Sequence, residues 1–212
     1  MVHFNDSLSR AVVAERRFGR AGSPWEFNLR DVLRWCELAE ASVEPSLLSS
    51  AADASAVADS AVSAAVLATF PVVYMHRMRT ADDRAQTMAL FAEHFGVGAA
   101  ALSAPAVVAS VDVVQIGVAR LLRAPSSVAH DSAVHAQLLL LREQLPAMEA
   151  AAAALSQGWM AVLVGPAASG KTTLARALAS LAGAKLHEVR LPRACCVLRS
   201  VPCQASGACA GM

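Results

Sequence analysis

The chain has 212 residues, a formal net charge of +1 and 56% hydrophobic residues, although only 5% of its residues are aromatic. This length allows one substantial domain or two small ones. The lysines and arginines are scattered apart from Arg16-Arg17 and residues 77–84, so the sequence lacks the basic patch typical of nucleic-acid binding. Much of the apolar fraction is alanine, which buries little area per residue, so the percentage overstates the core.

The mean hydropathy of +0.45 requires a search for membrane spans. Residues 150–169 carry no charge, but Gln157-Gly158 and Pro166 interrupt them. Residues 60–75 are also uncharged, yet this stretch is short and rich in alanine and serine. The N-terminus has no basic region followed by an apolar run. We therefore predict neither a membrane span nor a secretory signal.

The cysteines and histidines do not predict a metal site. Four of the five cysteines crowd residues 195–209 without paired CxxC spacing, and Cys36 falls on a predicted helix. The pattern is typical of a reduced, intracellular chain. Five histidines lack a ligand partner at metal spacing, and we assign them no chemistry: His76, His94, His130, His135 and His187.

In the first half of the chain, helical periodicity is clearest after Asn28. Asn28 is a good N-cap, and the apolar spacing predicts a helix to about Ala41. Residues 41–70 are rich in Ala, Ser and Val and are typical of a low-complexity linker or a loosely specified helix. After the charged segment 72–84, a helix should turn Met88, Leu90, Phe91 and Phe95 inward and end at Gly96 and Gly98.

The second half alternates between expected helices and strands. Residues 99–110 are low-complexity sequence, and 111–118 should form a short strand. Helices are expected over 131–145 and 146–156, with Pro146 suited to a first helical position. A buried strand over 160–164, a helix over 171–182 ended by Gly183, and a strand over 185–191 complete the pattern. Such alternation indicates an α/β fold with a parallel sheet.

A GxxxxGK[ST] motif lies between the expected strand at 160–164 and the expected helix at 171–182. Glycines allow backbone N–H groups to converge on a β-phosphate, a lysine reaches the β- and γ-phosphates, and a threonine hydroxyl can bind Mg²⁺. The helix start would also place a positive dipole end near the anion. The alternative is a chance turn in an alanine-rich chain. The expected ATP-binding residues are Gly165, Pro166, Ala167, Ala168, Ser169, Gly170, Lys171, Thr172 and Thr173, with Lys171 catalytic and Thr172 on Mg²⁺.

The residues after the motif hold no apolar run ending in an acidic pair. Hydrolysis normally needs such a carboxylate to hold Mg²⁺ and orient water. Residues 192–212 show no periodicity and many small residues, so we expect a disordered or aberrant tail. The sequence therefore predicts a truncated nucleotide-binding fold in which autonomous hydrolysis is doubtful.

Three blocks of the sequence together resemble the midasin family, the dynein-related AAA+ ATPases of ribosome assembly. Residues 18–36, with the run PWEFNLRD, look like the end of a AAA+ module, and residues 74–84 look like the lid segment that follows. Residues 137–191 are similar to the opening of the next module. The resemblance implies a helical lid at 1–95 with an insert at 41–70, a linker and N-terminal segment at 96–130, and the start of a P-loop domain at 131–191.

The resemblance also implies roles that spacing alone does not give. Arg30 matches the sensor-2 arginine, a lid cation for the nucleotide of the preceding module; the alternative is a solvated arginine paired locally with Asp31. Ile116-Gly117 would lie either beside the adenine or in loop packing, and Trp25 and Trp35 in lid packing. The family implies ATP and Mg²⁺, contacts with neighbouring modules of a long chain, and removal of assembly factors from pre-60S ribosomal particles in the nucleus.

Two other functions compete with this interpretation. A small P-loop kinase usually has its phosphate loop near the N-terminus, whereas here about four-fifths of the chain precedes it. A non-catalytic nucleotide-binding remnant would keep affinity without hydrolysis. Unpaired edges of a truncated sheet would make such a chain prone to aggregate.

Overall fold

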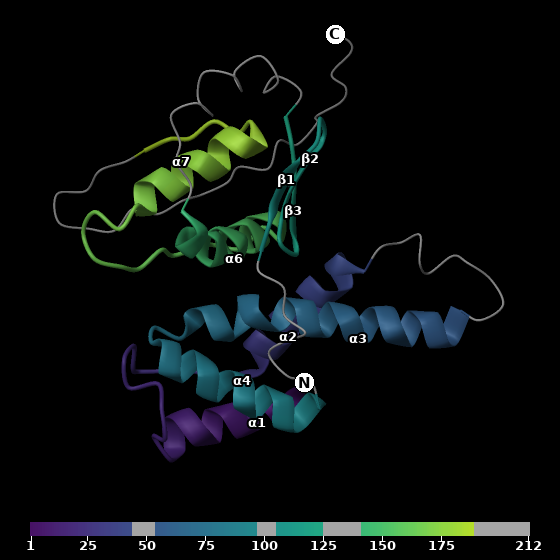
Figure 1. Ribbon diagram of the computed structural model, residues 1–212, viewed down its shortest axis with the longest axis vertical. Helices are drawn as coiled ribbons and strands as arrows, with labels where there is room; N and C mark the ends of the chain where they lie inside the picture. Colours follow the sequence, from purple (N-terminus) through teal and green to yellow (C-terminus); the bar gives the residue numbers. More distant parts are fainter. Residues whose placement is uncertain (44–53, 97–104, 125–140, 189–212) are drawn as a thin grey trace, which may run out of the picture.

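The structure, a computed structural model, describes residues 1–43, 54–96, 105–124 and 141–188. Figure 1 shows two groups of elements, a helical one below and a smaller one above that contains the sheet. The helical group consists of α1 (Val2–Ser9), the π-helical turn η1 (Arg10–Ala14), α2 (Leu29–Ser42), α3 (Ala54–Val73), η3 (Met75–Arg77) and α4 (Ala81–Phe95). The upper group consists of β1 (Val107–Ala109), β2 (Val113–Ile116), β3 (Ala119–Leu122), η6 (Arg142–Gln144), α6 (Leu145–Ser156) and α7 (Lys171–Ala182).

Helix α2 starts with a reciprocal cap. The Asn28 side chain accepts a hydrogen bond from the Arg30 backbone N–H at 3.0 Å, and the Asp31 carboxylate accepts one from the Asn28 N–H at 3.2 Å. These bonds satisfy backbone donors that a helix start leaves without partners. The predicted N-cap and helix are confirmed.

Helix α3 occupies most of the stretch that the sequence indicated as a linker or loosely specified helix. Alanine has the highest helix propensity, and α3 packs along α2, so packing orders a segment with little pattern of its own. Thr69 donates its hydroxyl to the Ala65 carbonyl at 2.7 Å, and Pro71 lies near the end of the helix. The linker interpretation is wrong for residues 54–70, and residues 44–53 lie outside the described part of the chain.

Helix α4 begins at a Thr80 cap and ends at a left-handed glycine. The Thr80 hydroxyl accepts from the Asp83 N–H at 3.0 Å. Gly96 closes the helix at φ +68°, as predicted. Of the four side chains expected to face inward, Met88 and Phe91 are buried and the other two are half-buried.

Aromatic rings fill the core of the helical group. The Phe4 ring contacts Trp35, Phe70 and Tyr74 edge-to-face, at centroid distances of 5.3 to 5.9 Å. The Phe70 and Phe91 rings stack at 3.8 Å. The Trp35 side chain has 0% exposure, and its indole N–H donates to the Val66 carbonyl at 3.1 Å and the Thr69 hydroxyl at 3.2 Å. The expected packing role of Trp35 is confirmed.

The sheet is an antiparallel meander in the order β1-β2-β3 rather than a parallel sheet. Val107 pairs with Ile116, and Ile116 pairs in turn with Ala119. The expected strand at 111–118 is confirmed only for β2, and two further strands flank it. A tight turn containing Gly117 at φ +56° connects β2 directly to β3, so the chain reverses where the sequence showed no turn pair.

Helices α6 and α7 lie on the same side of the sheet (Figure 1). Their buried side chains, including Met148 and Leu178, pack with Val114 and Ile116 of β2. Pro146 lies in the first turn of α6, and α7 ends at Gly183 with φ +63°, as predicted. The expected helix at 131–145 is not confirmed: residues 142–144 form a 3-10 turn, and 131–140 lie outside the described residues.

The segment before the GxxxxGK[ST] motif, whose loop at residues 165–170 is called the phosphate loop below, is not a strand. Within residues 160–164, only Ala161 forms an isolated bridge, and Met160, Val162 and Val164 are 70%, 57% and 71% exposed. A buried parallel strand needs a continuous ladder of hydrogen bonds to its neighbours, and within the described residues this segment shows only the bridge at Ala161. Residues 185–188 are likewise irregular; 189–191 and the expected tail at 192–212 lie outside the described part.

Candidate nucleotide-binding site

The phosphate loop folds around the lysine at the start of α7. The Lys171 ammonium donates to the carbonyl of Gly165 at 3.0 Å, the carbonyl of Pro166 at 2.5 Å and the hydroxyl of Ser169 at 3.3 Å. The loop therefore brings both ends of the motif together and holds the cation at its centre. Loop residues 165–169 are exposed, so an anion could reach them from solvent.

Two residues of the loop have a left-handed backbone conformation. Gly170 is the N-cap of α7 at φ +81°, in the left-handed region that favours glycine, and Ala168 also has positive φ, at +62°. A Cβ on Gly165 would lie 3.0 Å from the Ser169 hydroxyl, so a side chain at this position would have to displace that hydroxyl by a few tenths of an ångström.

The first turn of α7 can accept an anion. The helix has no side-chain cap, and its first backbone bond runs from the Leu174 N–H to the Gly170 carbonyl at 2.8 Å. The N–H groups of residues 171–173 therefore have no partner within the helix, at its positive dipole end. These donors, the Lys171 ammonium and the Thr172 hydroxyl fit a phosphate group with a bound Mg²⁺.

Arg30 lies in a different part of the molecule from the phosphate loop, in the first turn of α2 (Figure 1). Its side chain is exposed, and no ion pair holds its guanidinium within the described residues. The local alternative, a pair with Asp31, is not present. Asp31 instead pairs with Arg77 at 3.1 Å.

The charged segment 77–84 makes its contacts within the helical group. The Arg77 guanidinium lies 5.3 Å over the Phe27 ring and donates to the Glu26 carbonyl at 3.2 Å. The buried Asp83 carboxylate accepts from the Gly19 N–H at 2.7 Å, a contact between residues 64 apart in sequence. These bonds fasten the loop at 16–28 to η3 and α4.

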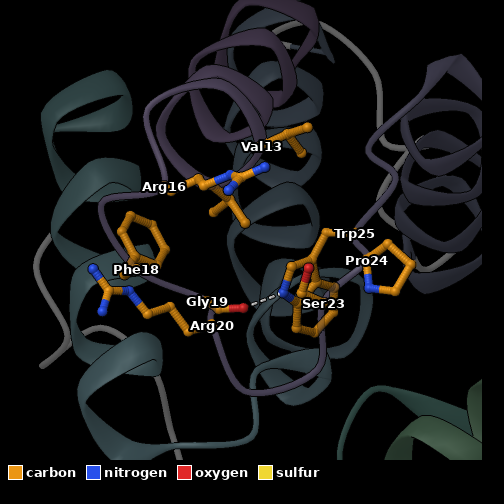
Figure 2. A pocket seen from close by; sticks show the side chains of 9 residues that line it. Val13, Arg16, Phe18, Gly19, Arg20, Ser23, Pro24 and Trp25 are labelled. Carbon is orange, nitrogen blue, oxygen red and sulfur yellow. Dashed lines mark hydrogen bonds between the residues drawn. The ribbon is translucent and has the colours of Figure 1, made fainter.

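Trp25 completes this loop (Figure 2). Its indole N–H donates to the Gly19 carbonyl at 2.5 Å, and its ring stacks on Phe27 with a centroid distance of 6.0 Å. The expected packing role of Trp25 is confirmed. Beside it lies an open hollow of about 520 Å³, which Val13, Arg16 and Arg20 also line.

His76 of η3 is half-buried. Burial and the nearby Arg84 cation lower the pKa of His76 to about 4, because both disfavour the imidazolium. Its Nδ1 atom is buried and has no hydrogen-bond partner among the described residues. His76 is therefore neutral near pH 7.

A buried glutamate fastens α6 to the sheet. Burial raises the pKa of Glu149, opposed by the hydrogen bond that its carboxylate accepts from the Val118 N–H at 2.9 Å. The carboxylate packs against Gly117, where a Cβ would lie only 1.9 Å from Oε1. Ile116 is wholly buried in the core, so Ile116-Gly117 takes part in packing.

Two contacts of the upper group could not be found from sequence. Arg123 donates to the Leu181 carbonyl at 3.0 Å, near the end of α7, and to the Ser110 carbonyl at 2.8 Å. Gln144 lies against Gly170 of the phosphate loop. Periodicity predicts neither contact, because both depend on tertiary packing.

The two groups of elements meet at α2, α3 and α6. Leu38 of α2 belongs to the core of the upper group, and Val72 and Val73 pack against it. The Arg34 guanidinium lies 5.3 Å over the ring of Trp159, six residues before Gly165. The helical group therefore touches the segment that leads into the phosphate loop.

Neither a metal cluster nor a membrane helix is found where the structure describes the chain. No group of three or more His, Cys, Asp or Glu residues is placed to bind a metal ion there. Among the same residues, no helix is both long and apolar enough to cross a bilayer.

Comparison with known proteins identifies the helical group. Residues 1–98 match the family described as the midasin AAA lid domain. The chain is 29% identical over 207 residues to midasin of Dictyostelium discoideum and 32% identical over 191 residues to midasin of Giardia intestinalis. These alignments cover 89% and 81% of this chain, but only 3% and 4% of the two relatives.

The helical group is thus an AAA lid domain, followed by a small antiparallel sheet and further helices. The chain belongs to the midasin family. The matched family reaches the end of α4 and leaves the phosphate loop beyond its last residue.

Proposed function

We propose that this chain contributes the lid of one AAA+ module and the nucleotide-binding start of the next. In this proposal, residues 1–95 form the lid, 96–130 a linker and N-terminal segment, 131–191 the start of a P-loop domain, and 192–212 a tail. The observation that carries the proposal is the closure of residues 165–170 around the Lys171 ammonium at the start of α7.

The loop residues would hold ATP through complementary charges. The Lys171 ammonium would neutralise the β- and γ-phosphates, and the N–H groups of the loop and of the first turn of α7 would donate to phosphate oxygens. The Thr172 hydroxyl would bind Mg²⁺, which neutralises phosphate charge when bound. The phosphates would have to compete with the Gly165 and Pro166 carbonyls for the ammonium.

Arg30 is proposed as the sensor-2 arginine of the module to which the lid belongs. Its exposed guanidinium, without an ion pair inside the described structure, is available to a nucleotide of that preceding module. The contact of Arg34 with Trp159, one turn further along α2, supports a junction between consecutive modules.

The cellular role that we propose is the removal of assembly factors from pre-60S ribosomal particles in the nucleus, as part of a longer chain with neighbouring AAA+ modules. It rests on membership of the midasin family. Binding without autonomous hydrolysis is the alternative. It is favoured by the segment at 160–164, which forms no continuous strand within the described structure, where a P-loop sheet would need one.

Nucleotide titration of the chain and its two single-lysine variants tests the proposal, since Lys171 and Lys185 are the only lysines. Lys171→Ala should weaken binding of Mg·ATP by at least about tenfold, because it removes a charge-assisted contact. Lys185→Ala, an exposed site beyond α7, should bind like the parent chain. Equal affinity in all three proteins, measured by calorimetry, would refute the assignment of the loop.

A further inference from the structure

The phosphate loop lies where two helices begin. Gly170 is the N-cap of α7, and Gln144 is the N-cap of α6. The two caps touch: a Cβ on Gly170 would lie 2.4 Å from the Gln144 side-chain nitrogen. Both helices start at the same end of the upper group (Figure 1). Residues 26 apart in sequence therefore meet at the mouth of the loop.

The Gln144 carboxamide has a defined orientation. Its oxygen accepts from the Leu141 N–H at 3.4 Å, while its own backbone N–H donates to the Leu141 carbonyl at 2.9 Å. Since the oxygen faces Leu141, the NH₂ group faces Gly170. A carboxamide nitrogen carries two N–H donors and accepts no hydrogen bond. The group turned toward the loop is thus a pure donor.

The electrostatic setting at this contact favours an anion. Helix α6 has 12 residues and no side-chain cap bond at its start, where the positive end of its dipole lies. The Lys171 ammonium and the first turn of α7 belong to the same site. Two helix starts, one ammonium and one neutral donor meet there, and the neighbouring acid on η6, Glu143, is exposed.

We propose that Gln144 is a further phosphate-binding residue of this loop, which donates a side-chain N–H to the polyphosphate beside Gly170. The inference rests on the proposed function, because it names an additional contact of the same site. It extends that site from the contiguous motif to a residue that precedes it by 21 positions. The polyphosphate would then be held between α6 and α7 rather than by α7 alone.

Substitution of Gln144 by glutamate tests the donor directly. Gln144→Glu keeps the shape of the side chain and replaces the NH₂ donor by an anionic oxygen, so ADP affinity should fall about tenfold or more. Gln144→Ala should lower it several-fold. The matched control is Gln157→Glu, the same change at the opposite end of α6, about 18 Å away for 12 residues, and it should leave affinity unchanged.

Two readouts separate phosphate binding from a structural role. Inorganic triphosphate should displace a fluorescent ADP from the parent chain, and about tenfold more should be needed with Gln144→Glu if the side chain contacts phosphate. Thermal unfolding without nucleotide should be nearly the same for the parent chain and both Gln144 variants. If Gln144→Glu does not fold, the ADP affinity of Gln144→Ala decides.

The outcomes distinguish the inference from the function on which it rests. Loss of ADP binding in Lys171→Ala together with unchanged binding in both Gln144 variants would overturn only the role of Gln144. A parent chain that binds neither ADP nor triphosphate would overturn the proposed function, and the inference with it. If the Gln144 variants bind ADP more weakly and also unfold at a clearly lower temperature without nucleotide, Gln144 stabilises the fold, and the donor role is refuted.

Discussion

The lid and the upper group are stabilised by different kinds of side chain. The lid concentrates its rings around Phe4 and adds buried polar bonds such as Asp83 to the Gly19 N–H. The upper group is packed largely by alanines of α6 and short aliphatic residues, and it leaves Met160, Val162 and Val164 exposed. Aromatic side chains bury far more area than alanine. The lid should therefore be the more stable unit, and the upper group the one that needs further partners.

The stabilities of the two regions should depend on pH in opposite directions. His76 in the lid is half-buried and neutral with a lowered pKa, whereas Glu149 in the upper group is buried with a raised pKa. A fall in pH should therefore weaken the lid through His76, and a rise in pH through the folded pKa of Glu149 should weaken the upper group. The difference gives a way to perturb each region without touching the other.

Removal of the Trp35 ring should give the largest effect. Trp35→Ala leaves a cavity at the centre of the lid and frees the partners of the indole N–H, so it should lower the free energy of unfolding by about 3–5 kcal/mol. Leu33→Ala, an exposed position on the same helix, should change it by less than about 0.5 kcal/mol. Urea denaturation followed by circular dichroism measures both. Similar midpoints for the two variants would contradict the aromatic core.

The second-largest effect should be the loss of lid stability on acidification. The folded protein binds a proton at His76 only near pH 4, whereas the unfolded chain binds it near pH 6.5, so stability is complete above about 6.5 and is lost as pH falls toward 4. A shift of this size corresponds to at most about 3 kcal/mol. His76→Gln should remove this component of the pH dependence. Parallel pH curves of unfolding free energy for the two proteins would show that His76 is not buried as described.

Glu149 should respond in the opposite direction and by less. Its folded pKa is raised, so its contribution is complete below the ordinary glutamate range and is lost as pH rises through the folded pKa. Glu149→Gln keeps an oxygen for the Val118 N–H and removes the buried charge. Its stability relative to the parent should therefore increase as pH rises through the ordinary glutamate range toward the folded pKa of Glu149. A pH-independent difference in urea midpoints would contradict the raised pKa.

Local sequence signals predicted what local physics determines. The Asn28 cap and the helix at 171–182 follow from capping and periodicity. The hypothesis that Lys171 binds phosphate follows from a contiguous motif. Tertiary contacts determine the rest. Helix α3 has no clear pattern and is ordered against α2, while the Gln144 contact joins two helix starts distant in sequence. The apolar run at 160–164 predicts a strand, but a strand forms only when a neighbouring strand pairs with it.

The exposed face of residues 160–164 gives the smallest expected effect. Val162 is 57% exposed and Leu163 is half-buried against the core of the upper group, so Val162→Thr should change the free energy of unfolding by less than about 0.5 kcal/mol and Leu163→Thr by about 1 kcal/mol or more. In a longer chain whose further strands pair with this segment, Val162 would become buried and Val162→Thr would cost about as much as Leu163→Thr. Urea denaturation of both variants in both chain lengths makes the comparison. An unchanged small effect of Val162→Thr in the longer chain would mean that the segment is no strand there either, and that the phosphate loop is supported by α6 and α7 alone.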